Sequence, residues 1–194
     1  MAKYTREMFI LDKFDNNEFI TREWDIVASS AIFKEEYIKD EAEKEVILSY
    51  ANALNCIEAS ILNQNHSSAA FIEFRVDSLT IPFIFIARHT VELALKYICR
   101  LLNLLYPPKH GLIVLWDKIL ERFNEFGFVQ DELDDVKIFI SVLEELDCDG
   151  SHFRYSEDNK GEVYNKKPQF INVKNINYFI QEIFVKFINS IKIE

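Results

Sequence analysis

The stretch that decides the fold is residues 81–105, IPFIFIARHTVELALKYICRLLNLL, an apolar run that ends just before Pro107 and Pro108. Thr80 suits the N-cap position of a helix, and Pro82 suits its first turn, where a missing backbone N–H costs nothing. An apolar run of this length without glycine is typical of a helix that is buried on most of its sides. The sequence therefore predicts a long central helix over these residues.

One narrow polar stripe runs along this otherwise apolar helix. Arg88, Glu92 and Lys96 lie at positions i, i+4 and i+8, and Arg100 and Asn103 continue the same face. A stripe this narrow faces a cleft, an interface or a thin strip of solvent. It is therefore the first place to look for a functional site.

Apolar residues spaced by three or four positions predict four more helices around the central one. They cover about residues 34–62, 110–126, 132–146 and 173–191, with Gly127 and Asp131 as caps of the second and third of these. The expected buried positions are, helix by helix, Ile38, Ala42, Val46, Ser49, Ala53, Ile57 and Ile61; Leu112, Leu115, Trp116, Ile119 and Phe123; Leu133, Val136, Ile140, Leu143 and Leu146; Ile176, Phe179, Ile180, Ile183, Phe184, Phe187 and Ile188.

Glycine and proline are too scarce for a protein made mainly of strands. The chain has 194 residues, of which 49% are hydrophobic but only 4 are glycine and 4 are proline, whereas a β-sandwich or barrel needs a turn about every 8 to 12 residues. We therefore expect an all-α bundle of about five main helices in a single domain over residues 1–194. Residues 1–30 form a less regular N-terminal extension, in which the runs 7–13 and 18–24 fit a small β-hairpin.

The charge of the chain is acidic overall but unevenly placed. The formal net charge is -10, which excludes a protein that coats nucleic acid or presents an extensive DNA-binding surface. Residues 1–78 carry -7 and residues 123–162 carry -9, whereas residues 79–122 and 163–194 carry +3 each. A local anion site near the central helix is therefore compatible with the sequence.

Cysteine, histidine and glycine spacings predict neither a metal site nor a cofactor. Cys56, Cys99 and Cys148 form no Cys-x-x-Cys pair and have no histidine close enough for a zinc ligand set. We expect free thiols, with Cys56 and Cys99 packed within apolar helical patterns. The 4 glycines make neither a P-loop nor a dinucleotide fingerprint, which excludes nucleotide binding by those folds.

The first thirty residues contain no apolar run long enough for a signal peptide or a membrane span. Acidic residues, among them Asp12, Asp15 and Glu18, interrupt the apolar positions. The simplest interpretation is a cytoplasmic protein without a membrane partner.

Three local patterns follow one another along the chain. The first is Ala87-Arg88-His89-Thr90-Val91-Glu92-Leu93-Ala94-Leu95-Lys96, the second is His110-Gly111-Leu112 followed by Leu115-Trp116, and the third is Ser151-His152-Phe153-Arg154-Tyr155 with Asp158 and Gly161. In this order and spacing, they resemble the bacterial branch of the HEPN domain family. The resemblance covers roughly Pro82 to Gly161, within the region 80–161, and extends loosely into the last helix.

This resemblance implies a helical bundle but not one activity. HEPN domains are small helical bundles, commonly paired as dimers, that occur in RNA-cutting toxins, phage-defence and stress-response systems and nucleotide-binding accessory domains. Their nuclease members carry an Arg and a His separated by four to six residues, in which the His acts as general acid or base and the Arg stabilises the charged phosphate. Here Arg88 and His89 are adjacent and His152 precedes Arg154, so no single motif carries the nuclease activity over.

The candidate ligand site draws polar side chains from the central helix, the next helix start and the late loop. In one interpretation they converge in a groove, where the helix start at His110 adds backbone N–H groups suited to a phosphate. In the other, Arg88 pairs with Glu92, Lys96 pairs with an acid elsewhere in the bundle, and the late loop is fixed to the helix ends. The candidate ligand-binding residues are Arg88, Glu92, Lys96, His110, Arg154 and Tyr155.

Two functions are compatible with these residues. The first is a non-catalytic binding module for a nucleotide, RNA or a partner protein, in a bacterial stress or phage-defence system. The alternative is a metal-independent ribonuclease of the toxin or defence type, with His89, His110 or His152 as its acid–base group. The binding module is favoured because the chain lacks an Arg and a His separated by four to six residues.

We also expect a homodimer, formed through the wide apolar faces of the central or the last helix.

Overall fold

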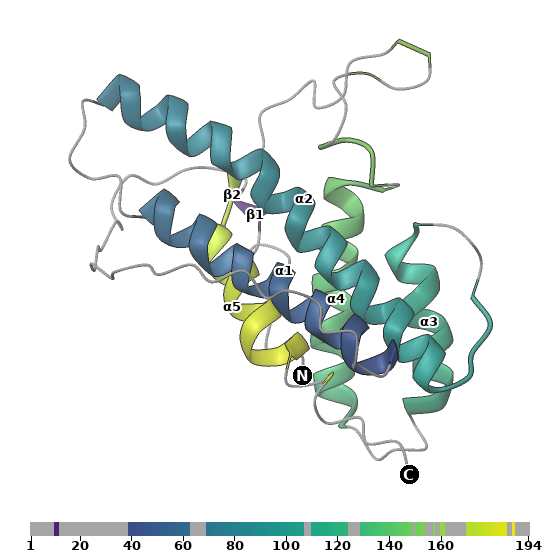
Figure 1. Cartoon of the computed structure of the whole chain (residues 1–194). Helices are drawn as coiled ribbons and strands as arrows, with labels where there is room; N and C mark the ends of the chain where they lie inside the picture. The colour runs from purple at the N-terminus through teal and green to yellow at the C-terminus, as the bar shows by residue number, and fades with distance from the viewer. Residues whose placement is uncertain are drawn as a thin grey trace.

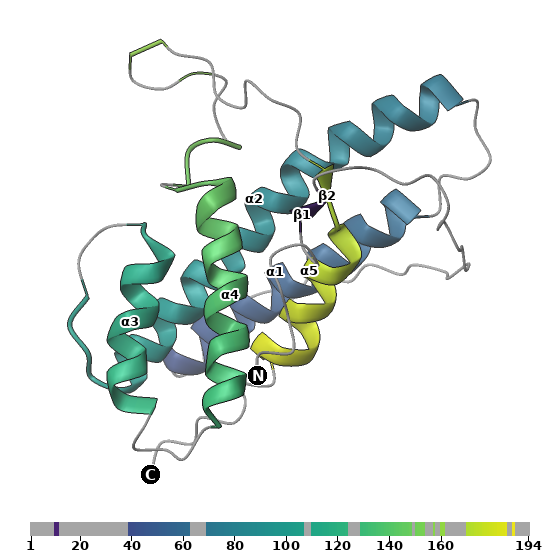
Figure 2. The same cartoon turned by 180° about the vertical axis from the view of Figure 1, so that it is seen from behind.

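Two long antiparallel helices, α1 (Lys39–Leu62) and α2 (Ala69–Leu101), lie side by side in the structure (Figures 1 and 2). An ion pair between Glu43 and Arg100 joins the start of α1 to the end of α2, as the antiparallel arrangement requires. The computed structural model describes residues 10–11, 39–62, 69–106, 110–123, 129–148, 150–153, 157, 160–161, 170–185 and 188.

A second antiparallel pair, α3 (Leu112–Phe123) and α4 (Gln130–Leu146), packs against α2 (Figure 2). The expected buried side chains of both helices are confirmed. Asp131 is not the N-cap of α4, because the helix begins at Gln130, two residues before the predicted start, and its N-cap is Val129, which makes no side-chain hydrogen bond. Asp131 instead lies in the first turn, where its charge favours the helix dipole. The predicted cap Gly127 lies outside the described residues.

The central helix begins earlier than predicted. It starts at Ala69 and runs through Thr80 and Pro82, so Thr80 is not its N-cap and Pro82 lies inside the helix. The prediction relied on proline as a helix-start signal, but a proline inside a helix costs only about 3 kcal/mol. The packing of the following turns, which begin with the fully buried Phe83 and Ile84, is large enough to offset that cost.

The central helix also ends earlier than predicted, at Leu101 rather than Leu105. Asn103 has a positive φ of 52°, its N–H donates to the Arg100 carbonyl at 3.0 Å, and the N–H of Leu104 donates to the Cys99 carbonyl at 2.8 Å. This pair of hydrogen bonds is a Schellman motif with asparagine in the left-handed position. The asparagine, and not the later prolines, therefore ends the helix.

The last helix starts at Val173 as predicted but does not continue as one α-helix. The Asn172 side chain caps α5 (Val173–Phe179) by accepting the N–H of Asn175 at 3.0 Å. A π-helical segment, η2 (Ile180–Phe184), follows directly. Wider turns of this kind are rare and change the direction in which later side chains point, which a regular spacing of three and four cannot predict.

A short strand pair joins the N-terminal extension to the segment before α5. Strand β1 (Ile10–Leu11) pairs antiparallel with β2 (Phe170–Ile171), with Ile10 opposite Ile171. The turn and the second run of the predicted hairpin, residues 18–24, lie outside the described residues. The one described strand of the extension thus has a partner about 160 positions away in the chain.

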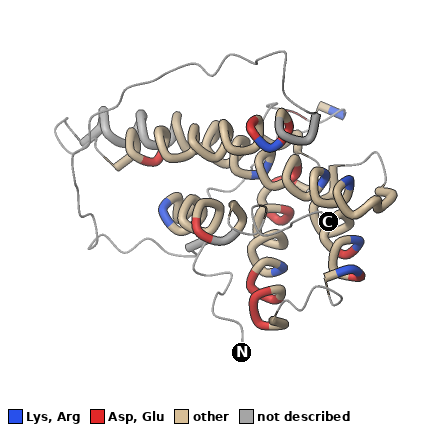
Figure 3. Tube along the Cα trace, turned by 60° about the horizontal axis from the view of Figure 1, so that its bottom comes forward, with Lys and Arg blue, Asp and Glu red and all other residues tan. Residues whose placement is uncertain are grey.

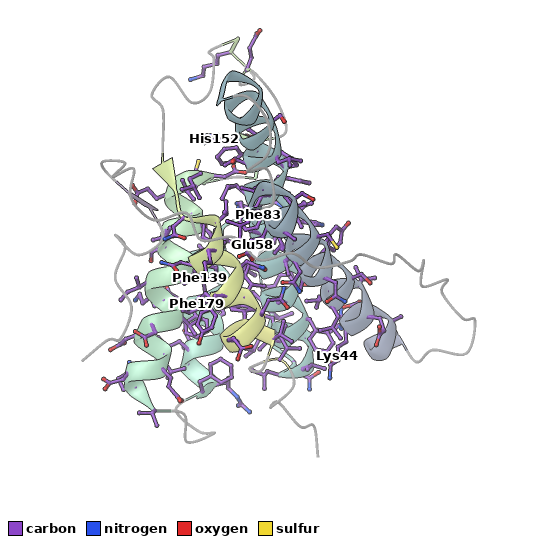
Figure 4. The ribbon with its side chains drawn as sticks, turned by 90° about the vertical axis from the view of Figure 1, so that its left-hand side faces the viewer. Lys44, Glu58, Phe83, Phe139, His152 and Phe179 are labelled. Atoms are coloured by element: carbon purple, nitrogen blue, oxygen red, sulfur yellow. The ribbon has the colours of Figure 1, made fainter. Side chains whose placement is uncertain are left out.

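The core is one cluster of buried side chains to which α1, α2, α3, α4 and α5 all contribute. Phe139 of α4 and Phe179 of α5 stack at 4.2 Å between ring centroids (Figure 4), a contact that stabilises the packing beyond the area it buries. The apolar faces of α2 and α5 that were expected to pair two chains are largely used inside this core. On α1 the predicted stripe is only partly right, because Ile61 is buried and Ile57 packs against the core, but Ser49 is exposed. The other buried residues of α1 are Ile47, Ala51 and Leu54.

Among the described residues, one helical stretch, Ser78–Leu101, is long and apolar enough by composition to cross a membrane. Half of its most apolar window is buried inside the bundle. The core helix of a folded bundle has the same composition, so this stretch is weak evidence for a membrane span.

Candidate functional site

Arg88, from the polar stripe of α2, is buried with a relative exposure of only 2%. Its Nε donates to the carbonyl of Asp147 at 2.6 Å, Nη1 donates to Glu92 Oε2 at 3.0 Å, and Nη2 donates to the carbonyl of His110 at 2.5 Å. One guanidinium therefore links α2 to the residue after α4 and to the residues before α3. Its position favours the interpretation in which Arg88 stabilises the fold.

Glu92 lies at the centre of the charged cluster. Its Oε1 accepts hydrogen bonds from Lys96 Nζ at 2.6 Å and from His110 Nδ1 at 2.8 Å, while Oε2 binds Arg88. Burial raises the pKa of Glu92, but the hydrogen bonds from Lys96 and His110 outweigh it and hold the pKa below its ordinary value. Lys96 thus pairs with an acid on its own helix and not, as one interpretation expected, with an acid elsewhere in the bundle.

The start of α3 is already occupied by a carboxylate. Glu144 of α4 accepts the backbone N–H of Leu112 at 2.5 Å, and it lies so close to Gly111 that a Cβ there would be 3.4 Å from its Oε1. An anion at a helix N-terminus takes the position that Glu144 holds. The expectation that this helix start offers N–H groups to a phosphate is therefore wrong for the N–H of Leu112.

The residues of α4 also change the charge around the site. Charged residues along α4 are mostly acidic (Figure 3), and the carboxylate of Glu144, near its C-terminal end, lies at the start of α3. Arg88 and Lys96 both pair with the single acid Glu92. Glu144 adds a negative charge beside this basic segment, at the helix start that was expected to attract a phosphate.

A small pocket opens beside the cluster, with a volume of about 60 Å³. This volume accommodates a few water molecules or the edge of a planar group. The ring of His89 lies parallel to that of Phe85 at 5.8 Å and edge-on to that of Tyr50 at 5.1 Å. The residues that line the pocket are Phe85, Arg88, His89, Glu92, His110 and Gly150.

Of the three predicted histidines, the structure brings two to this pocket. His89 and His110 line it, and the side chain of His110 is 55% exposed. His152 lies in the turn after α4 (Figure 4), where its backbone N–H donates to Asp147 Oδ1 at 3.2 Å, and it does not line the pocket. The candidate residues Arg154 and Tyr155 lie outside the described residues.

Sequence reasoning missed several residues of the site. Phe85 was assigned only to the apolar run, and Glu144 and Asp147 were not among the candidate site residues. A spacing signal for Phe85 does exist, because Phe85, Arg88 and Glu92 follow each other by three and four positions. No local pattern identifies Glu144 or Asp147, because Leu112 lies 32 positions from Glu144 and Arg88 lies 59 positions from Asp147.

In the described part of the chain, no group of three or more His, Cys, Asp or Glu side chains is placed to hold a metal ion.

No protein-family model, no curated protein and no solved structure matches this chain. The resemblance to HEPN domains therefore stays a prediction from the sequence patterns, and the all-α bundle is what the structure establishes.

Proposed function

We propose that the chain is a non-catalytic HEPN-like binding module that holds a nucleotide or a segment of RNA through its base. The observation that supports this most directly is the lining of the pocket, which combines the parallel rings of Phe85 and His89 with the carboxylate of Glu92. Unpaired bases stack on flat side chains, and a carboxylate accepts hydrogen bonds from the amino groups that bases carry on their edges.

The charges of the site favour a base over a phosphate as the bound group. Glu92 faces the pocket, and Glu144 occupies the nearest described helix start. Glu144 repels a phosphate at that helix start, whereas the rings of Phe85 and His89 attract a base by stacking rather than by charge. Lys96, which is partly exposed, supplies a positive charge next to the pocket for the phosphate that accompanies the base.

The position of Arg88 favours binding over cleavage. A ribonuclease that works without a metal uses a cation to stabilise the phosphate in the transition state. Arg88 is the one arginine in the pocket lining, but it is buried and its Nε, Nη1 and Nη2 atoms all donate to protein groups. Reaching a phosphate would break bonds that hold three segments together.

Thermal unfolding in the presence of nucleoside monophosphates and of a short mixed-sequence RNA tests this proposal. A ligand at 100 times its Kd raises the free energy of unfolding by about 2.7 kcal/mol. We expect His89→Ala to weaken the binding of these ligands by about tenfold or more, since one base–ring stack is lost. The matched control is Lys118→Ala on the exposed face of α3, which should leave binding unchanged.

Two outcomes contradict base recognition. Inorganic phosphate that stabilises the protein as well as the nucleotides would show that the bound group is the phosphate. A chain that no nucleotide or RNA stabilises would leave a partner protein as the ligand of the binding module.

A ribonuclease is the second candidate, and one contact favours it. The hydrogen bond from His110 Nδ1 to Glu92 orients a half-exposed imidazole at the pocket, as carboxylates do for catalytic histidines. Incubation of a mixed RNA pool with the wild-type chain and with His89→Ala, His110→Ala and His152→Ala tests it. Cleavage that disappears in His110→Ala supports the nuclease, and cleavage that no variant weakens comes from a contaminant.

The oligomeric state and the biological system that we propose follow from the resemblance to HEPN domains. HEPN-like proteins commonly act as dimers, so we propose a cytoplasmic homodimer in a bacterial stress or phage-defence system. Mass determination in solution at several concentrations tests the dimer, which a monomer at every concentration would contradict.

A further inference from the structure

A thiol and an imidazole lie together in the turn that follows α4, outside the lining of the pocket. Cys148 is exposed, and its Sγ lies 3.9 Å from Nε2 of His152. Figure 4 shows His152 at this end of α4. The pair thus lies on the surface, where small molecules in solution have access to the sulfur.

The contacts of His152 orient its ring toward the thiol. Its backbone N–H donates to Asp147 Oδ1 at 3.2 Å, and its Nδ1 lies 3.4 Å from the carbonyl oxygen of Leu146. A carbonyl oxygen only accepts hydrogen bonds, so this contact favours the tautomer with the proton on Nδ1. Nε2 is then the acceptor, and it is the ring nitrogen that faces Cys148. A nucleophile beside a base that a third group orients is the arrangement found at reactive cysteines.

We propose that Cys148 and His152 form a modification site, at which the Cys148 thiol exchanges with a low-molecular-weight disulfide to give a mixed disulfide. Nε2 of His152 takes the thiol proton, and the Cys148 sulfur attacks one sulfur of the disulfide. The disulfide bond breaks, and the departing thiolate takes the proton from the imidazolium. Cys148 is oxidised to a mixed disulfide, and the small disulfide is reduced to one thiol. This site does not depend on what the pocket binds.

The other two cysteines provide comparisons within the same chain. Cys56 was expected to be packed within an apolar pattern, but it is exposed on α1, and it reports how fast an accessible thiol reacts. Cys99 is buried, and burial raises its pKa to about 11, so it should stay unmodified while the protein is folded. Differences between Cys148 and Cys56 therefore measure the contribution of the surroundings rather than of exposure.

The experiment uses the full chain with an excess of oxidised glutathione, and mass spectrometry of the digested protein follows each cysteine over time. We expect Cys148 to be modified at least about tenfold faster than Cys56, as general-base assistance predicts. In His152→Gln, which keeps the backbone N–H bond to Asp147, the ratio of the two rates should fall to about one. Unfolding the wild-type protein in guanidinium should remove the difference in the same way.

The proposal is overturned if Cys148 reacts no faster than Cys56 in the folded wild-type protein. It is also overturned if His152→Gln, with an unchanged melting temperature, keeps the wild-type ratio. A second variant, His152→Ala, removes the imidazole and also shortens the side chain. It should behave as His152→Gln does, because the proposal depends on the imidazole and not on the length of the side chain.

Discussion

Nδ1 of His110 lies 2.8 Å from Oε1 of Glu92, although 18 positions separate the two residues in the chain. The same carboxylate binds Lys96 and the buried Arg88. A single acid on α2 thus orients the imidazole of His110 at the pocket. It also compensates the charge of Arg88, the residue that links three segments of the chain. Changes at Glu92 are therefore expected to affect the bundle and the site together.

Replacing Glu92 by glutamine should lower the free energy of unfolding by about 3 kcal/mol at neutral pH, since the buried Arg88 loses its carboxylate. Burial raises the pKa of Glu92, but its hydrogen bonds from Lys96 and His110 hold it below the ordinary value. The stabilisation is therefore complete above that ordinary value and is lost as the pH falls through the lower pKa of the folded state. Urea unfolding of both proteins from neutral pH downward measures this, and a difference that stays constant on acidification contradicts it.

Arg88→Met should destabilise the protein far more than Lys96→Met. Arg88 is 2% exposed and links three segments, so its loss leaves Glu92 and two carbonyl groups without their partner and costs about 3–5 kcal/mol. The Lys96 side chain is 26% exposed, and the loss of a pair open to solvent costs at most about 1 kcal/mol. Denaturant midpoints of the two variants provide the test. Equal losses would show that Arg88 does not have the structural role assigned to it.

Glu144→Ala should lower the free energy of unfolding by about 1–2 kcal/mol, because the N–H of Leu112 at the start of α3 loses its acceptor. The control is Glu121→Ala, whose exposed pair with Lys118 at 3.8 Å contributes little. Inorganic phosphate should stabilise Glu144→Ala more than the wild type, because the vacated helix start then accepts an anion. Equal stabilisation of both proteins, measured by melting temperature, would contradict the assignment of Glu144 as the group that occupies this helix start.

Asn103→Gly should raise the free energy of unfolding by about 0.5–1 kcal/mol, and Asn103→Ala should lower it by a similar amount. Asn103 ends α2 with a φ of 52°, a conformation that glycine adopts without strain and alanine does not. Thermal unfolding of the two variants checks the order glycine, asparagine, alanine. Any other order would mean that the backbone of residue 103 does not decide where α2 ends.

Glu58→Gln should leave the protein as stable as the wild type at neutral pH, or more stable. Burial raises the pKa of Glu58, and the hydrogen bond from Asn177 and the charge of Lys174 only partly oppose this. An acid with a raised pKa in the folded state disfavours folding at neutral pH, and this cost disappears as the pH falls through the raised value. The advantage of Glu58→Gln over the wild type should therefore shrink on acidification, the opposite of the trend at Glu92. A deficit at neutral pH that grows on acidification would contradict it.

The expectations from sequence succeeded where structure is local. The buried faces of α3 and α4 follow a spacing of three and four residues, and each helix alone carries that signal. They failed at Thr80, Pro82 and Asp131, where a residue with a strong preference for helix ends lies within a helix. In these places the packing of the neighbouring turns outweighs a preference of only about 1–3 kcal/mol.

The sequence by itself determined that this protein is an all-α bundle and that its central helix carries a narrow polar stripe with Arg88, Glu92 and Lys96. Only the tertiary structure decided what the stripe does, because Arg88 meets the carbonyl groups of residues 22 and 59 positions away. Helical periodicity is set by neighbours within one or two turns, whereas such contacts depend on how α3 and α4 pack against α2. For the same physical reason, only the packing of α4 against α3 shows that the carboxylate of Glu144 occupies the helix start that the sequence offered to a phosphate.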